Sequence, residues 1–191
     1  MNADIQIIDN FLSNDQFKEL KEFVEGDAKI PWMLSQNVAS RYDTGEAICE
    51  ERYNYQFAHT LYDNGASPSP FAHCLNNFLR VLDPMLLLRC KVNLNPGTDK
   101  IIDHGLHIDI LPYEVAKNCT TGVFYINTNN GYTRFEDGSK VESIANRLVL
   151  FPSIMKHTGS TCTDEKYRTV LNVNFMLRGS EVEYPKLDLK K

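Results

Sequence analysis

The chain has 191 residues, a mass of 21.9 kDa, a formal net charge of −5 and a pI near 5.5. The acidic balance disfavours a basic nucleic-acid surface, and the sequence has no apolar run near the roughly 18 residues of a membrane span. The N-terminus lacks the features of a signal peptide, and the five cysteines are scattered without a CxxC pair. We therefore expect a cytoplasmic, soluble protein with reduced thiols, formed by one domain over residues 1–191.

The N-terminal segment predicts a strand followed by a helix. A short strand is expected at Ile5–Asp9. Ser13 suits the N-cap of the helix, and Gln16 three residues later completes a capping box. Apolar residues then recur at helical spacing, and Gly26 is a suitable end.

The middle of the chain changes from a helical to a strand-like pattern. Residues 28–69 predict irregular structure with one or two strands, which would form a lid or a substrate rim. A second helix is expected over residues 70–83, with Pro70 at its first position. Further strands are expected at residues 86–94, 106–111, 122–127, 132–135, 140–141, 147–151 and 168–177, with a turn at 95–97.

Helices followed by many short strands favour a mainly β (α+β) fold. We expect a double-stranded β-helix, or jelly roll, with residues 85–178 as its core. Residues 1–84 would supply the supporting N-terminal strand and helices together with the rim.

The triplet His107-Ile108-Asp109 is the strongest candidate for chemistry. On an extended strand, side chains two residues apart share a face, so His107 and Asp109 can reach one point. Two histidines and one carboxylate on one face select ferrous iron for oxygen chemistry, so a distant second histidine is required. His104 is a rival for His107, but position 106 is leucine and provides no partner carboxylate.

The second histidine is predicted to be His157. A lone histidine at a strand end is more often a loop residue, but its order after the His-x-Asp strand favours a ligand. His59 is expected to pack or to lie on the rim, and His73 to be structural or exposed within the second helix pattern.

The last predicted strand opens with a cation. By period two, Arg168 shares a face with Val170, Asn172 and Asn174. If this face lines the barrel, Arg168 is a buried cation that needs an anion. The anion could be an acidic residue in a salt bridge with Arg168, or a small dicarboxylate bound by the guanidinium. Lys166 has the same parity, so parity alone does not choose between the two cations.

The sequence resembles the iron(II)- and 2-oxoglutarate-dependent dioxygenases, specifically the prolyl 4-hydroxylase-like branch. The resemblance is carried by the order of His107, Asp109, His157 and Arg168. The resemblance extends from the first strand to the last. Three further segments are similar to motifs of that family: Gly122–Asn127, Gly131–Phe135 and Asn146–Ser153.

The resemblance implies an oxidoreductase that binds Fe(II) through His107, Asp109 and His157. Arg168, preferred over Lys166 because it lies in a Tyr-Arg-x-x-x-Asn pattern, would bind the distal carboxylate of 2-oxoglutarate. The other residues implied in the cofactor pocket are Tyr125, Thr133 and Asn172. Ascorbate would help to keep the iron reduced.

The same resemblance implies hydroxylation of a C–H bond with succinate and CO2 as co-products. The branch indicates a peptidyl proline or another protein side chain, and small molecules remain an alternative, whereas a nucleic-acid base is disfavoured. Candidate rim residues are Arg41, Tyr42, Tyr53, Tyr55, Tyr113 and Asn174.

Two other classes of protein share parts of this pattern. A non-catalytic cupin-type jelly roll could bind a metal or a sugar, with Arg168 held in a salt bridge. A zinc-dependent hydrolase could use the same three ligands, but the sequence offers no well-placed general base.

Overall fold

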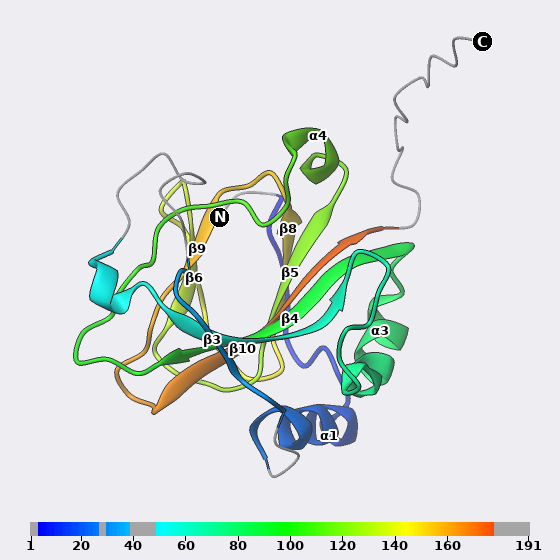
Figure 1. Ribbon diagram of the computed structural model, residues 1–191, viewed down its shortest axis with the longest axis horizontal. Coiled ribbons are helices and arrows are strands. Elements are labelled where there is room, and N and C mark those ends of the chain that lie inside the picture. Colours follow the sequence, from blue (N-terminus) through cyan, green and yellow to red (C-terminus); the bar gives the residue numbers. More distant parts are fainter. Residues whose placement is uncertain (1–3, 27–29, 39–48, 178–191) are drawn as a thin grey trace.

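The computed structural model describes residues 4–26, 30–38 and 49–177. Two antiparallel sheets face each other, as Figure 1 shows. The large sheet has the order β1-β8-β5-β10-β4-β3-β2, and the small sheet has the order β7-β6-β9. The mainly β jelly-roll fold predicted from the sequence is confirmed. Within the described ranges, no helix is long and apolar enough to cross a membrane.

The strands of the large sheet are β1 (Gln6–Ile8), β2 (Met33–Ser35), β3 (Gln56–Asp63), β4 (Leu86–Pro96), β5 (Thr120–Tyr125), β8 (Leu148–Pro152) and β10 (Tyr167–Met176). Those of the small sheet are β6 (Tyr132–Phe135), β7 (Lys140–Glu142) and β9 (His157–Gly159). The helices are α1 (Asn14–Glu25), η1 (Glu51–Tyr53), η2 (Ala72–Leu75), α3 (Asn76–Leu82) and α4 (Tyr113–Ala116).

Helix α1 begins as predicted. The Ser13 hydroxyl accepts a hydrogen bond from the backbone N–H of Gln16, and the Gln16 side chain accepts one from the Ser13 N–H. Both bonds satisfy backbone donors that the first helical turn leaves without partners. Leu20 and Val24 are buried against the outer face of the large sheet, where α1 and α3 lie together in Figure 1.

The second helix differs from its prediction at its start. A 3-10 turn, η2, precedes the short helix α3, so the predicted start at Pro70 is wrong. The Ser69 hydroxyl accepts the N–H of Phe71, which stabilises a turn at this point instead of a helix. The predicted end before Pro84 is confirmed, because Asp83 adopts a left-handed conformation with φ of 46°.

The alternation along β10 divides its side chains between two environments. Leu171, Val173 and Phe175 pack in the core beneath the helices. Arg168, Val170, Asn172 and Asn174 face the space between the two sheets, as their parity predicts. The inward face of β10 is therefore polar at three of four positions.

The N-terminal segment contributes β1, β2 and β3 to the large sheet, whereas the sequence predicted mainly a rim between its helices. Strand β3 pairs with β4, β2 pairs with β3, and β1 pairs with β8. The turn predicted at residues 95–97 is also displaced, since Asn95 and Pro96 still pair with Arg168 and Tyr167 of β10. Cross-strand pairing outweighs the local turn preference there.

Candidate metal centre and anion pocket

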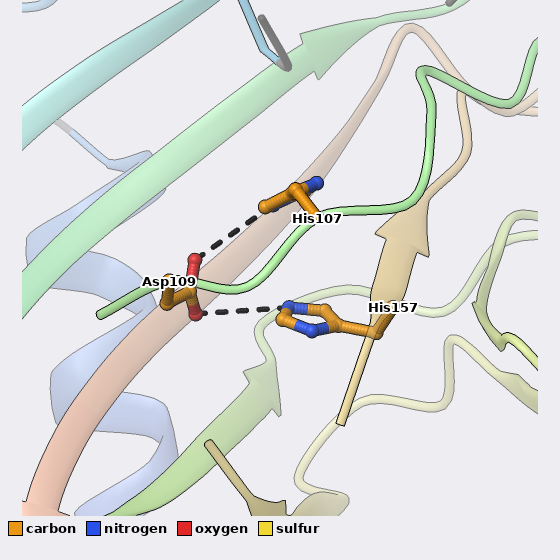
Figure 2. Close-up of side chains that lie close together, drawn as sticks. All are labelled: His107, Asp109 and His157. Carbon is orange, nitrogen blue, oxygen red and sulfur yellow. Dashed lines mark ion pairs between the residues drawn. The ribbon is translucent and has the colours of Figure 1, made fainter. Parts of the chain in front are cut away.

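Three side chains form a compact group between the sheets. The ligand atoms of His107, Asp109 and His157 lie within 4.8 Å of one another, and no other such group occurs among the described residues. His107 Nε2 lies 3.7 Å from Asp109 Oδ1, and His157 Nε2 lies 3.6 Å from Asp109 Oδ2. Figure 2 shows the three side chains converging, with His157 on β9 and the other two on an irregular segment.

The prediction of a strand at residues 106–111 is wrong, although the side chains of His107 and Asp109 do converge. His107 makes one isolated bridge to His157, in which each backbone N–H donates to the other residue's carbonyl at 2.9 and 3.0 Å. Gly105, with φ of 118°, turns the chain before this bridge. The bridge and the side chains that hold Asp109 therefore replace strand alternation as the cause of convergence.

Backbone carbonyls fix the tautomers of both histidines. His107 Nδ1 donates to Gly105 O at 3.0 Å, and His157 Nδ1 donates to Met155 O at 3.2 Å. A carbonyl can only accept, so the neutral form of each ring carries its lone pair on Nε2, which is directed at Asp109. Burial lowers the pKa of His157 to about 4, which keeps this imidazole neutral at physiological pH. Both rings are thus prepared to bind a metal.

Neighbouring side chains hold Asp109 in its charged form. Asn172 Nδ2 and Asn174 Nδ2 donate to Oδ2 at 3.0 and 3.3 Å. Arg89 Nη2 lies 3.3 Å from Oδ1. Burial alone would raise the pKa of Asp109, but electrostatic interactions with His157, which is protonated in the acidic range where Asp109 titrates, and with Arg89 outweigh it and hold the pKa below its ordinary value. At physiological pH the group therefore offers one carboxylate and, in His157, a neutral imidazole.

Arg168 is a buried cation whose protein partners are uncharged. It is 2% exposed, and burial lowers its pKa from the ordinary value. Its Nε donates to Ser143 Oγ at 2.7 Å, and its Nη2 donates to Thr133 Oγ1 at 3.2 Å. The Tyr125 hydroxyl donates to the same Thr133 oxygen at 2.8 Å. In the part of the chain that the structure describes, no carboxylate pairs with Arg168, so the salt-bridge interpretation lacks a partner.

One cavity joins the group formed by His107, Asp109 and His157, called the metal group from here on because it could hold a metal ion, to the Arg168 guanidinium. Its lining includes His107, Asp109, His157, Thr133, Arg168 and Asn172. Lys166 is exposed in the loop before β10 and does not line this cavity, so the geometry favours Arg168 as the anion-binding cation. Gly131 is required beside it, because a Cβ there would lie 2.8 Å from the Arg168 Cδ.

The remaining histidines lie outside the metal group. His104 is fully buried and donates from Nδ1 to Gly159 O at 3.1 Å. His59 packs through contacts of its two ring nitrogens with Pro31 O and the Ser69 hydroxyl. His73 is exposed, as expected.

The predicted rim residues have varied positions. Arg41 and Tyr42 lie outside the described residues. Tyr55 and Tyr113 are exposed and Tyr53 is half-buried, and none of these three lines the cavity. Asn174 contacts Asp109 rather than the rim.

Sequence reasoning missed three polar residues of the site. Arg89 and Lys91 appear in the sequence as polar residues alternating with apolar ones, a signal that marks the inward face of β4. Ser143 follows β7 and carries no comparable signal, because only the fold brings it to Arg168.

Comparison with known proteins shows the fold. No family model and no curated protein matches the sequence. A prolyl-4-hydroxylase from Pseudomonas putida has a TM-score of 0.58 and 18% identity over 93% of this chain and 94% of that chain. A prolyl hydroxylase from Trichoplax adhaerens, in complex with a hypoxia inducible factor peptide fragment, has a TM-score of 0.58 and 16% identity over 92% of this chain and 84% of that chain.

A third solved structure is HygX from Streptomyces hygroscopicus with nickel, 2-oxoglutarate and hygromycin B bound. Its TM-score is 0.56, with 10% identity over 92% of this chain and 84% of that chain. The chain therefore has the jelly-roll fold of 2-oxoglutarate–Fe(II) oxygenases, including prolyl hydroxylases.

Proposed function

We propose that this chain is a 2-oxoglutarate- and Fe(II)-dependent dioxygenase that hydroxylates a substrate C–H bond. The observation that carries the proposal is Arg168, a buried cation with uncharged protein partners in the cavity that also holds the His-Asp-His group. A metal group alone suits many functions. A metal group joined to a buried anion pocket suits a dicarboxylic keto acid that chelates the metal and extends to the guanidinium.

The residues present fit both cofactors. Nε2 of His107, Nε2 of His157 and a carboxylate oxygen of Asp109 would hold the iron, since the two Nδ1 atoms are already committed to carbonyls. Arg168 would bind the distal carboxylate of 2-oxoglutarate, with Thr133 and Tyr125 completing that end of the pocket.

Iron and 2-oxoglutarate, when bound, would supply the oxidising power for hydroxylation by O2, with succinate and CO2 as the co-products. The protein contributes placement. Asn172 and Asn174 fix the orientation of Asp109 by donating to Oδ2. Val123 and Val170 provide apolar surface in the cavity and limit the room for water.

The substrate classes suggested by the fold are a peptidyl proline, another protein side chain or a small molecule. Two of the structural neighbours support this range, since one binds a peptide fragment and another binds hygromycin B. We also propose that ascorbate keeps the iron reduced and that the protein is cytoplasmic.

Oxygen-dependent formation of succinate tests the proposed activity. The protein is incubated with Fe(II) and 2-oxoglutarate in air and under argon, and succinate is measured. We expect succinate in air only, its loss in Asp109→Ala and His157→Ala, and its retention in His73→Ala, which removes an exposed histidine. Metal binding without any oxygen-dependent succinate would contradict the oxygenase and favour the cupin-type binding module.

A further inference from the structure

The inward face of β4 carries a second polar surface in the cavity. Along this strand Arg89, Lys91, Asn93 and Asn95 alternate with residues that pack toward the helices, among them Cys90 and Val92. Burying two cations and two amides on a strand that faces the interior of a jelly roll costs free energy unless these groups meet polar partners.

The two cations of this face differ in their partners. Arg89 pairs with Asp109 Oδ1 at 3.3 Å and donates from Nε to Asn174 Oδ1 at 3.2 Å. Lys91 is half-buried and lines the cavity beside Asp109, yet among the described residues its ammonium has neither a hydrogen bond nor an ion pair. The function of Arg89 is therefore explained by the metal group, whereas that of Lys91 is not.

Two acceptors near Lys91 also lack partners. Asn93 Oδ1 and Asn172 Oδ1 are buried and make no hydrogen bond. The orientation of Asn172 is fixed because its Nδ2 donates to Asp109, so its oxygen is the free atom. Lys91 is the direct partner of Asn172 across the β4–β10 ladder, and Asn93 is the next inward residue on β4. One ammonium donor and two acceptors thus share one part of the cavity.

This part of the cavity lies beside Asp109 and away from Arg168. Arg168 pairs across the ladder with Asn95, four residues or about 13 Å along the strands from the Lys91–Asn172 pair. The Arg168 end is closed by Thr133 of the small sheet. Lys91 lies one strand farther toward β3, so the distal carboxylate of a keto acid bound by Arg168 does not occupy its ammonium.

We propose that Lys91, together with Asn93 and Asn172, binds the molecule that is oxidised, and that this molecule is a small carboxylic acid bearing an amino or hydroxyl group. The ammonium binds the carboxylate, and the two amide oxygens accept from the amino or hydroxyl group. This inference rests on the proposed function and narrows its substrate class away from a peptidyl proline, which has no free carboxylate.

The test compares acids with their uncharged counterparts. The probes are a mixture of free L-α-amino acids, the mixture of their α-carboxamides, and a proline-containing peptide blocked at both ends. The readout is the rate of succinate formation with Fe(II) and 2-oxoglutarate in air. The proteins are the wild type, Lys91→Met, Lys91→Arg and the control Lys18→Met, which removes an exposed lysine from α1.

We expect the acids alone to accelerate succinate formation in the wild type and in Lys18→Met. Lys91→Met should need at least about tenfold more acid for the same acceleration, because a charge-assisted hydrogen bond is lost, and Lys91→Arg should recover part of it. Equal acceleration by carboxamides or by the blocked peptide, an unchanged response in Lys91→Met, or no response to any acid would overturn the inference.

A separate readout distinguishes failure of the inference from failure of the proposed function. Under argon, the visible band of the iron–keto-acid chelate should appear with the same 2-oxoglutarate dependence in the wild type and in Lys91→Met. This result also shows that the variant retains the folded site. Absence of the band in the wild type would refute the proposed function itself, and the inference with it.

Discussion

Replacing Arg168 with methionine separates the binding role of the guanidinium from its contribution to folding. The variant loses hydrogen bonds from the charged guanidinium to the Ser143 and Thr133 hydroxyls, each worth about 1.5–3 kcal/mol, and Thr133 keeps its bond from Tyr125. It also loses a buried charge whose desolvation costs several kcal/mol. These effects oppose each other, so we expect the unfolding free energy of the metal-free protein to change by less than about 2 kcal/mol.

The effect on 2-oxoglutarate should be far larger. Two charge-assisted hydrogen bonds to a carboxylate are worth about 3–6 kcal/mol together, which corresponds to at least about a 100-fold increase in Kd. Calorimetric titration of the Mn(II)-loaded protein measures Kd, and urea unfolding measures stability. Lys166→Met is the matched control, because it removes an exposed cation two residues away.

The outcome that refutes this reasoning has two forms. If Arg168→Met keeps its 2-oxoglutarate affinity within about threefold, the guanidinium does not bind the keto acid. If the variant loses more than about 3 kcal/mol of unfolding free energy, the arginine is chiefly a structural residue.

Further predictions concern the metal group and the fold. Asn172→Leu removes a donor to Asp109 and should weaken Fe(II) binding about tenfold in a chelator competition; unchanged affinity contradicts this role. Ser13→Ala removes the cap of α1 and should lower the unfolding free energy by about 1 kcal/mol in urea, and no change refutes it. Burial holds the pKa of His104 and His157 at about 4, below the ordinary 6.5. The unfolded chain therefore binds more protons between these values, and unfolding free energy should fall as pH decreases from 6.5 toward 4, by up to about 1.4 kcal/mol per unit for each histidine. A flat profile contradicts their burial as neutral rings.

The strand β10 shows why much of the site could be predicted from sequence. A strand buried on both faces normally carries apolar residues at nearly every position. A polar residue at Arg168 and another at Asn172 therefore mark a face turned toward a ligand rather than toward the helices. Period-two alternation depends only on local geometry, so it transfers from sequence to structure without knowledge of the fold.

The segment around His107 shows the opposite case. Alternation predicted a strand there, but the chain makes only one bridge and then bends. Convergence with Asp109 depends on contacts from β4, β9 and β10, which no local pattern encodes. Ser143 was missed for the same reason, since only the fold brings it to Arg168. The alternation of β4 does mark Lys91 as an inward residue, but the lack of a partner for its ammonium appears only in the structure.

Anaerobic titration of the Fe(II)-loaded protein with 2-oxoglutarate tests the central claim most directly. The weak visible charge-transfer band of the chelate reports iron and keto acid in one site. The account predicts a saturable band in the wild type, its loss in His157→Ala and a large shift to higher 2-oxoglutarate concentration in Arg168→Met. Normal iron binding with no band at saturating 2-oxoglutarate would contradict it.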